Sequence, residues 1–413
     1  MQNSFKAGQN RIYAYLLFFI WPFLSIFVAF YEYKTSWAKN LIWFFVAFYA
    51  YTMVISHAGM DANRYRAQFI EVAQSDEKFD SENGLYSVAT NNVDFLQPLL
   101  NIIVAKVTDN YKVLFLVYGL IFGYFFSRNI WLLLENTPRN HIIKIGIPIL
   151  IVFAFINPFW NINGFRFWTA SQIFVYGCLV YFLKGKKKGL LIILTTVLVH
   201  FSFMLPIAIL LLYKFLGNRL NIYFYFFIAS LFVSELSLDA VRSNLAFLPT
   251  IYENRVEAYT DAEYKELRLE NSQSSNWYVN LHAVALRFSV YVFLIALYWK
   301  TRVYIKKNKK IYSLFNFILL FFGIANIISS VPSAGRFTIV ASCIAMAFVY
   351  LSVQFLNDRI INLIIKISIP ALLLFFIVAV RVGFYTIGLT TVFGNPLIAV
   401  FMENDKALIE LIK

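Results

Sequence analysis

Apolar runs long enough to cross a bilayer recur along almost the whole of this chain, and they decide the solvent in which it can fold. Of its 413 residues 60% are hydrophobic, and the mean hydropathy is +0.66, so the chain cannot be an ordinary water-soluble domain. Runs of about 17–25 apolar residues are typical of membrane-spanning helices, because in hydrocarbon only a helix or a closed barrel satisfies its own backbone. We predict ten complete crossings, at residues 12–31, 41–56, 111–131, 143–159, 165–183, 221–235, 281–299, 311–330, 336–355 and 360–380.

The predicted fold class is an all-α polytopic membrane protein of GT-C-like architecture, with residues 1–413 forming a single integral membrane domain. Two long loops leave the membrane, at 57–110 and 236–280, and the first of them holds interfacial helices. Its segment "FLQPLLNIIVAKV" is too short, and too interrupted by Pro98, to cross. A further crossing at 384–401 is doubtful, because Gly394-Asn395-Pro396 interrupts it.

The net charge of +14 sits in short loops between the apolar runs. These loops are "KGKKKG" at 184–189, Lys214 with Arg219, and the stretch from Lys300 to Lys310, which holds six basic residues and no acid. Short basic loops are cytoplasmic by the positive-inside rule. The same distribution argues against nucleic acid as a partner, although the overall charge alone would invite it.

Acidic residues concentrate in the two long loops. Residues 57–94 hold seven of the 22 acids and 235–280 hold eight, and each loop has a net charge of −4. We therefore place both loops outside the cytoplasm. Counting crossings back from the cytoplasmic loops puts residues 1–11 outside as well, although the charges flanking the first run balance.

One histidine lies in an otherwise uncharged run. Residues 189–213 contain no Asp, Glu, Lys or Arg, and the stretch "VHFSFMLP" places His200 near the middle. If this segment crossed as a single straight helix, the basic stretch from Lys300 to Lys310 would lie outside and the acidic loop 235–280 inside, against the positive-inside rule. We therefore predict that the segment enters and returns as two half-helices broken between His200 and Pro206. His200 would then face a polar cavity as a functional group. The alternative is a buried structural histidine bonded to a neighbouring hydroxyl such as that of Ser202.

Four arginines lie near the outer ends of predicted crossings, against the positive-inside trend. They are Arg166, Arg287, Arg336 and Arg381. A guanidinium binds phosphate bidentately and never loses its proton, so the four together suggest a site for a phosphate or diphosphate head group. Snorkelling, or pairing with loop carboxylates, is the alternative.

The outer loops carry two candidate faces for sugar binding. In "GMDANRYRAQF", Asp61, Tyr65 and Phe69 share one helical face, although Asp61 could instead be the N-cap of that helix. The second face, in "YENRVEAY", is formed by Tyr252, Arg255 and Tyr259. Aromatic rings with interleaved carboxylates suit sugars, but aromatic residues at a membrane interface form the same pattern.

Common cofactor motifs do not occur in the sequence. There is no nucleotide-binding glycine loop and no HExxH or CxxC spacing, and the two cysteines, Cys178 and Cys343, lie inside predicted crossings. We therefore expect neither a metal nor a cofactor, and a donor that arrives already activated.

The order of these motifs resembles the EpsG-like polysaccharide polymerases, which belong with the Wzy-type O-antigen and exopolysaccharide polymerases. The resemblance rests on the motif that runs from Gly59 to Phe69, on Gly164-Phe165-Arg166-x3-Ala170, on "VHFS" at 199–202, and on Gly335-Arg336. It spans nearly the whole chain, and each motif is short. Arg287 and Arg381 have no counterpart in it and depend on the topology argument alone.

The resemblance implies an enzyme of the bacterial cytoplasmic (inner) membrane that works at its outer face. Donor and acceptor would both be glycans on undecaprenyl diphosphate in the lipid bilayer, with a chain-length regulator protein as a conceivable further partner. Arg166 and Arg336 would stabilise the diphosphate leaving group, with Arg287 and Arg381 in a second ring. His200 is the favoured general base and Asp61 the alternative, and Ser202 is a further substrate contact. Tyr65, Tyr252, Arg255 and Tyr259 would contact the glycan.

Other activities share parts of this pattern. A glycan ligase would use the same donor with a different acceptor. A lipid-linked oligosaccharide flippase or other transporter should show internal repeats, and the two halves show no convincing self-similarity. A membrane acyltransferase fits less well, because the charged residues here face outward.

Overall fold

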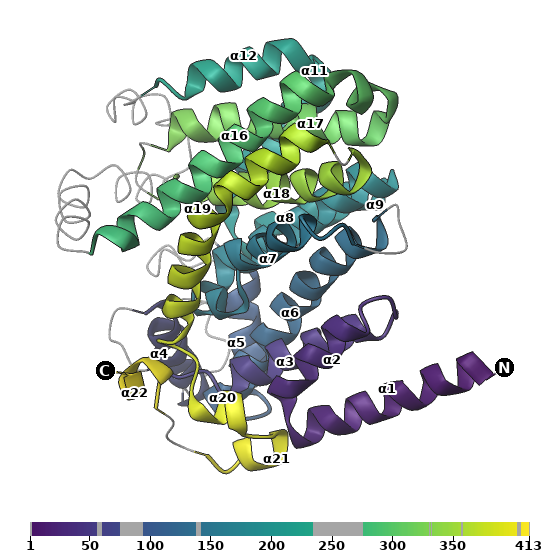
Figure 1. The fold of residues 1–413 in the computed structure, drawn as a ribbon. Coiled ribbons are helices and arrows are strands. Elements are labelled where there is room, and N and C mark those ends of the chain that lie inside the picture. The colour runs from purple at the N-terminus through teal and green to yellow at the C-terminus, as the bar shows by residue number, and fades with distance from the viewer. Residues whose placement is uncertain are drawn as a thin grey trace.

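The computed structural model describes residues 2–55, 60–74, 94–137, 142–233, 276–329, 331, 333–356, 358–402 and 406–412, with 2–9 and 301–307 described by their backbone. All regular secondary structure in these ranges is helical (Figure 1), apart from one isolated bridge between Gly388 and Ala407. The all-helical class is therefore confirmed. Six segments of the described chain are long and apolar enough to cross a membrane: Tyr111–Glu135, Gly146–Lys184, Trp277–Lys300, Lys309–Ile328, Arg336–Leu356 and Arg359–Gly383.

The first predicted crossing, 12–31, is not one helix. Helix α1 (Gln2–Ile20) ends before Trp21, and α2 (Pro22–Tyr31) starts anew. Asn10 Nδ2 donates to Glu32 Oε1 over 3.3 Å, so the two helices run back along each other. The break follows from Pro22, which disfavours helical backbone at the residue before it; Trp21 has φ −148° and ψ 86°. The expectation that 12–31 forms one complete crossing, and so separates residues 1–11 from the loop that follows it, is therefore wrong.

Two other predicted crossings are short helices in the structure. The run 41–56 forms α3 (Ala38–Tyr51), and 221–235 contributes α12 (Leu220–Ser230), which has 11 residues. At about 1.5 Å per residue such a helix is shorter than a bilayer core. The count of ten complete crossings is thus not what the described chain shows.

One end of the bundle gathers basic side chains, and we call it the basic end. Helix α6 (Tyr111–Glu135) finishes there at Glu135, whose carboxylate accepts from Lys39 Nζ at 3.2 Å and from Lys184 Nζ at 3.3 Å. Lys184 is the last residue of α8 (Phe165–Lys184). The first residue of α8 therefore lies toward the opposite end, about 28 Å away along the helix axis.

The predicted crossings 143–159 and 165–183 form one apolar stretch that turns back on itself. Helix α7 (Gly146–Ile156) is followed by the 3-10 helix η1 (Phe159–Gly164) and then by α8. Just before α7, Ile143 N donates to the side chain of Gln354, near the end of α18 (Arg336–Leu356). Tyr350 of α18 in turn contacts Thr137, just after α6, so α7 begins at the basic end and η1 turns at the opposite end.

The histidine segment is a broken helix pair, as predicted. Helices α9 (Lys188–Leu194) and α10 (Thr196–Val199) lead to His200, a short 3-10 helix η2 (Phe201–Phe203) follows, and α11 (Met204–Leu216) leads away.

The two ends of this helix pair that are distant from His200 both lie next to the start of the same helix, α17 (Lys309–Ile328). A Cβ placed on Gly185 would lie 3.8 Å from Lys310, and Asn218 Nδ2 donates to Ser313 Oγ at 3.2 Å. Lys310 and Ser313 belong to the first turns of α17. The segment therefore enters from the basic end and returns to it, with His200 at its far point.

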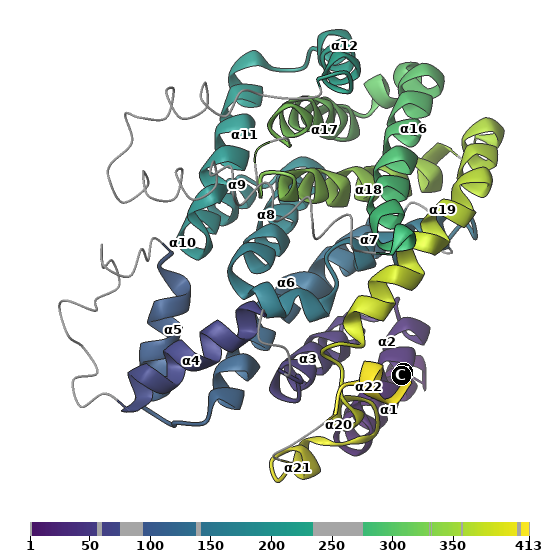
Figure 2. The same cartoon turned by 90° about the vertical axis from the view of Figure 1, so that its left-hand side faces the viewer.

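The long helices lie side by side in Figure 1, where α8, α17, α18 and α16 (Trp277–Lys307) form stacked layers. Figure 2 shows α4 (Asp61–Gln74), α5 (Leu96–Ala105) and α10 along one side, and α16 with α19 (Arg359–Gly383) along the other. Helix α5 has ten residues, which agrees with the prediction that this segment is too short to cross.

The C-terminal segment after α19 does not form a crossing helix. The region 384–401 contains α20 (Leu389–Phe393) and α21 (Pro396–Ala399), separated at Gly394 and Asn395. The final helix, α22 (Leu408–Ile412), follows. Pro396 begins a new helix and cannot continue the old one, as the sequence indicates.

Candidate functional site

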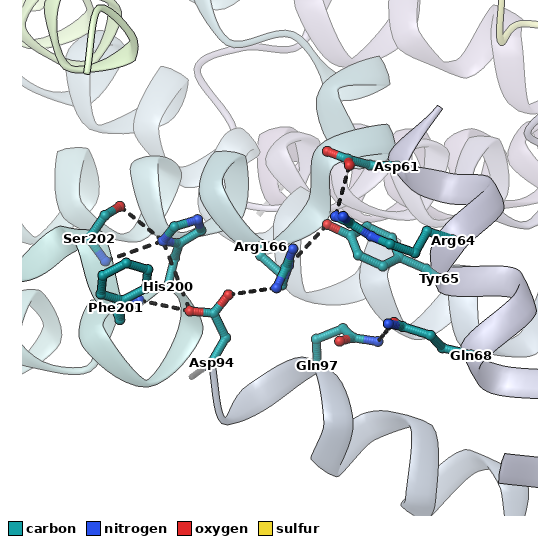
Figure 3. A network of polar contacts seen from close by, with 10 residues as sticks. All are labelled: Asp61, Arg64, Tyr65, Gln68, Asp94, Gln97, Arg166, His200, Phe201 and Ser202. Carbon is teal, nitrogen blue, oxygen red and sulfur yellow. Dashed lines mark hydrogen bonds and ion pairs between the residues drawn. The ribbon is translucent and has the colours of Figure 1, made fainter. Parts of the chain in front are cut away.

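A buried ion pair forms the centre of the polar cluster drawn in Figure 3. Arg166 Nη1 lies 2.9 Å from Asp94 Oδ2; the Asp94 side chain is fully buried and that of Arg166 is 14% exposed. Arg166 Nε also donates to the Tyr65 hydroxyl over 3.2 Å. An arginine with two such partners is held in one orientation, because its planar fork has fixed directions.

Asp94 connects this arginine to the break in the histidine segment. Its second oxygen, Oδ1, accepts the backbone N–H of Phe201 at 2.9 Å. Next to Asp94, Phe95 N donates to the carbonyl of Leu198 over 3.1 Å. The two residues before α5 therefore bind the chain on both sides of His200.

His200 is the N-cap residue of the 3-10 helix η2. The residue has extended backbone, and its Nδ1 accepts the N–H of Ser202 at 3.3 Å and lies 2.9 Å from Ser202 Oγ. Asp94 Oδ1 is 4.0 Å from the same nitrogen. The predicted break and the hydroxyl contact are thus both present, and His200 is buried at 7% exposure.

Asp61 lies at the rim of the cluster. Its side chain is 45% exposed and Oδ1 accepts from Arg64 Nη2 at 2.9 Å. The next backbone N–H, of Ala62, donates to Asn163 Oδ1 of η1 at 3.1 Å. Gly164 allows this approach: a Cβ there would come within 2.8 Å of Trp168 and 3.5 Å of Asp61 Oδ2.

Tyr65 has a different place from the one expected. The predicted face of α4 exists, but Tyr65 is 1% exposed and Phe69 is fully buried. The ring of Tyr65 packs edge-on against Tyr118, which stacks on Phe165 with centroids 3.8 Å apart. Tyr65 therefore positions Arg166, and no face of its ring is open for a sugar.

Phe167 brings Arg336 to the same region. The Arg336 guanidinium carbon lies 5.6 Å from the centroid of the Phe167 ring, and the His200 ring meets that ring edge-on at 5.5 Å. No acid among the described residues forms an ion pair with Arg336, whereas Arg166 and Arg64 each pair with an aspartate. Arg336 therefore supplies the uncompensated positive charge of this cluster.

The other two arginines do not join it. Arg381 lies over the ring of Tyr278 at 5.5 Å, which places it against the start of α16. Arg287 lies about two and a half turns further along α16. Arg287 belongs to α16 and Arg381 to α19, the two helices along the side opposite α4, α5 and α10 in Figure 2, so these two of the four predicted arginines come from another part of the bundle. Tyr252, Arg255 and Tyr259 lie outside the described residues.

Asp94 is the functional candidate that sequence reasoning missed. It is one of the seven acids of the first outer loop, but it directly precedes the apolar segment "FLQPLL" and stands 12 residues after Glu82, the nearest preceding acid. An isolated acid at the start of a short apolar helix is the sequence signal that marks it. In the part of the chain that the structure describes, no group of three or more His, Cys, Asp or Glu side chains is arranged to hold a metal.

Comparison with known families identifies the group to which this arrangement belongs. The model of the EpsG family matches residues 41–392, which is most of the chain and includes every residue of the cluster. The chain belongs to the EpsG family. This family contains Wzy-type polysaccharide polymerase-like membrane proteins, so the predicted resemblance is confirmed. No curated protein and no solved structure matches the chain, and the GT-C-like architecture stays a prediction.

Proposed function

We propose that this EpsG-family protein is a polysaccharide polymerase that joins oligosaccharide repeat units carried on undecaprenyl diphosphate. It would act at the outer face of the bacterial cytoplasmic membrane, with the basic end in the cytoplasm. The cluster around Asp94, Arg166 and His200 lies toward the opposite end of the bundle, which supports this orientation. Family membership supports the reaction type.

The proposed reaction transfers a growing glycan to the non-reducing end of another lipid-linked unit. The bond between the anomeric carbon and the diphosphate oxygen breaks, and the diphosphate leaves with the electron pair. The anomeric carbon joins an acceptor hydroxyl oxygen, which gives up its proton. The group that must be stabilised is the departing diphosphate, and fixed guanidinium groups do this electrostatically.

The observation that carries the proposal is the contrast between Arg166 and Arg336, which contacts the ring of Phe167. No acid in the described part of the chain pairs with Arg336, and Arg166 is held by Asp94 and Tyr65 so that its position is preset. We assign the diphosphate to these two arginines, with Arg336 providing the net charge. Arg287 and Arg381, on the α16–α19 side, suit the more distant part of the lipid-linked chain.

The test is the polysaccharide ladder from cells that lack the gene, complemented with wild type or with Arg336→Gln at matched expression. Deletion should leave lipid that carries a single repeat unit, and wild type should restore the ladder. Arg336→Gln should insert in the membrane and leave the single unit. Full-length polymer that is not transferred to its anchor would instead indicate a ligase, and repeat units retained on the cytoplasmic side would indicate a flippase.

A further inference from the structure

We infer that His200 works as a hydrogen-bond donor through Nε2 and that Asp61, not His200, accepts the proton of the acceptor hydroxyl. This inference rests on the proposed polymerase function. It starts from the Nδ1 atom, which accepts the backbone N–H of Ser202 at 3.3 Å. A backbone N–H can only donate, so Nδ1 must present its lone pair.

The position of the proton on His200 follows from this contact. A neutral imidazole carries one proton, and the hydrogen bond at one nitrogen decides which nitrogen holds it. With Nδ1 accepting, the proton is on Nε2. Ser202 is only two residues away, and the extended backbone of His200, with φ −152° and ψ 117°, directs the ring back over the turn. The tautomer is therefore set by the local fold of the break.

Nε2 of His200 is a hydrogen-bond donor in both the neutral and the protonated imidazole. The second proton would go to Nδ1, which lies 4.0 Å from Asp94 Oδ1. Nε2 carries a proton in both states. To act as a general base, His200 would have to receive the substrate proton at Nδ1, which faces Ser202 and the fully buried Asp94.

Two carboxylates of the cluster could take the proton instead, and they differ in access. Asp94 has no exposed surface, and its two oxygens are engaged by Arg166 and by Phe201 N. Asp61 is 45% exposed, at the first residue of α4 and beside Gly164. Asp61 is therefore the carboxylate that an acceptor sugar can reach.

His200 and Arg336 act on the same ligand group, because both rest on the ring of Phe167, at 5.5 and 5.6 Å. The acceptor proton moves to the Asp61 carboxylate while the acceptor oxygen joins the anomeric carbon. The diphosphate leaves with the electron pair of the broken bond, and the Nε2–H of His200 donates to one of its oxygens without being transferred. Every proton and electron pair is thereby accounted for.

Two amide substitutions separate the possible roles of His200. Glutamine can place its amide N–H₂ where Nε2–H was, whereas asparagine can keep an oxygen near the Nδ1 position but has no distal donor. Neither amide can accept a proton at neutral pH. We expect His200→Gln to keep a measurable ladder and His200→Asn to lower polymer synthesis by about 100-fold, the usual effect of removing one preorganised donor. Asp61→Asn should also abolish the ladder.

The opposite results overturn the inference. If both amide variants fold, shown by an unchanged unfolding temperature in detergent, and neither makes polymer, His200 is the base. If His200→Asn is active and His200→Gln is not, the residue is only a cap.

The tautomer is read independently of activity from the imidazole ¹⁵N resonances of labelled protein. The signal of His200, one of four histidines, is assigned by its loss in His200→Gln. Resonances of an Nε2–H tautomer support the inference even if the protein proves to be a ligase, and those of an Nδ1–H tautomer refute it even if the protein is a polymerase.

Discussion

Asp94 links more of the polar cluster than any other described residue, because each of its oxygens binds a different segment. One oxygen holds Arg166 at the start of α8, and the other holds Phe201 in the break. A buried pair of this kind contributes little net stability, since desolvation offsets the attraction, but removing one partner leaves an unpaired buried charge. The contribution of Asp94 here is to fix the positions of Arg166 and Phe201 relative to each other.

The first prediction concerns this pair. Asp94→Asn or Arg166→Gln alone should lower the free energy of unfolding by about 3–5 kcal/mol, and the double variant should recover much of that loss. Thermal unfolding in detergent measures both. The control is Arg64→Gln, which breaks the exposed pair with Asp61 and should cost less than about 1 kcal/mol. Equal losses that simply add in the double variant would show that the pair is not a unit.

The second prediction concerns Arg336, whose charge no described acid balances. Arg336→Gln should lower the rate of polymer formation by about 100- to 1,000-fold, with little change in stability, because it removes an electrostatic contact to the leaving group. The same exchange at Arg219, an exposed residue at the start of α12, is the matched control and should leave the ladder intact. Comparable losses in both variants would point to a general effect of charge on expression.

Glycines decide how closely the helices approach one another. Gly119 and Gly123 of α6 face α3, and a Cβ on Gly119 would lie 2.6 Å from the Cβ of Ala50 and 2.8 Å from the Cα of Ala47. Small residues allow this approach in a membrane, where helix association depends on packing rather than on the hydrophobic effect. The contact matters for the site because α6 also supplies Tyr118, which holds Phe165 at the start of α8.

The third prediction tests this contact. Gly119→Ala should destabilise the protein by about 1–3 kcal/mol, since the added methyl group meets backbone that cannot yield. Gly335→Ala is the matched control, because its nearest new neighbour would be the Ser329 carbonyl at an ordinary 3.7 Å. Unfolding temperatures of the two variants give the comparison. An unchanged value for Gly119→Ala would mean that α3 and α6 separate more easily than the structure implies.

The molecule as a whole has two chemically different ends. Lys39, Glu135 and Lys184 meet at the basic end, and the polar cluster lies toward the other. The hairpin of α1 and α2 brings Asn10 beside Glu32. Asn10 therefore lies at the basic end, whereas a complete crossing at 12–31 would place it outside.

The fourth prediction is therefore topological. Single cysteines replacing Asn10 and Asn218 should be inaccessible to an impermeant thiol reagent in intact cells and should react after the membrane is opened. A cysteine replacing Arg64 should react in intact cells. Cys178 and Cys343 are buried, so the background is low. Labelling of Asn10→Cys from outside would contradict the placement of the hairpin.

Hydrophobic periodicity and charge, read from the sequence, determined the solvent, the helical class and the re-entrant path of 189–213. These are properties that local chemistry controls: an apolar run must close its own hydrogen bonds, and a basic loop resists translocation. The EpsG family match was likewise predictable, because it rests on short motifs whose order the sequence displays.

Only the tertiary structure decided which charges meet. Arg166 and Arg336 looked equivalent in sequence, yet one is paired with Asp94 and the other is not. Asp94 itself looked like any acid of an outer loop, and Tyr65 like an exposed aromatic residue, until packing buried both. Periodicity reports which side of an element faces the core, but the partner of a buried charge comes from a segment distant in the chain, and its identity depends on how the helices pack.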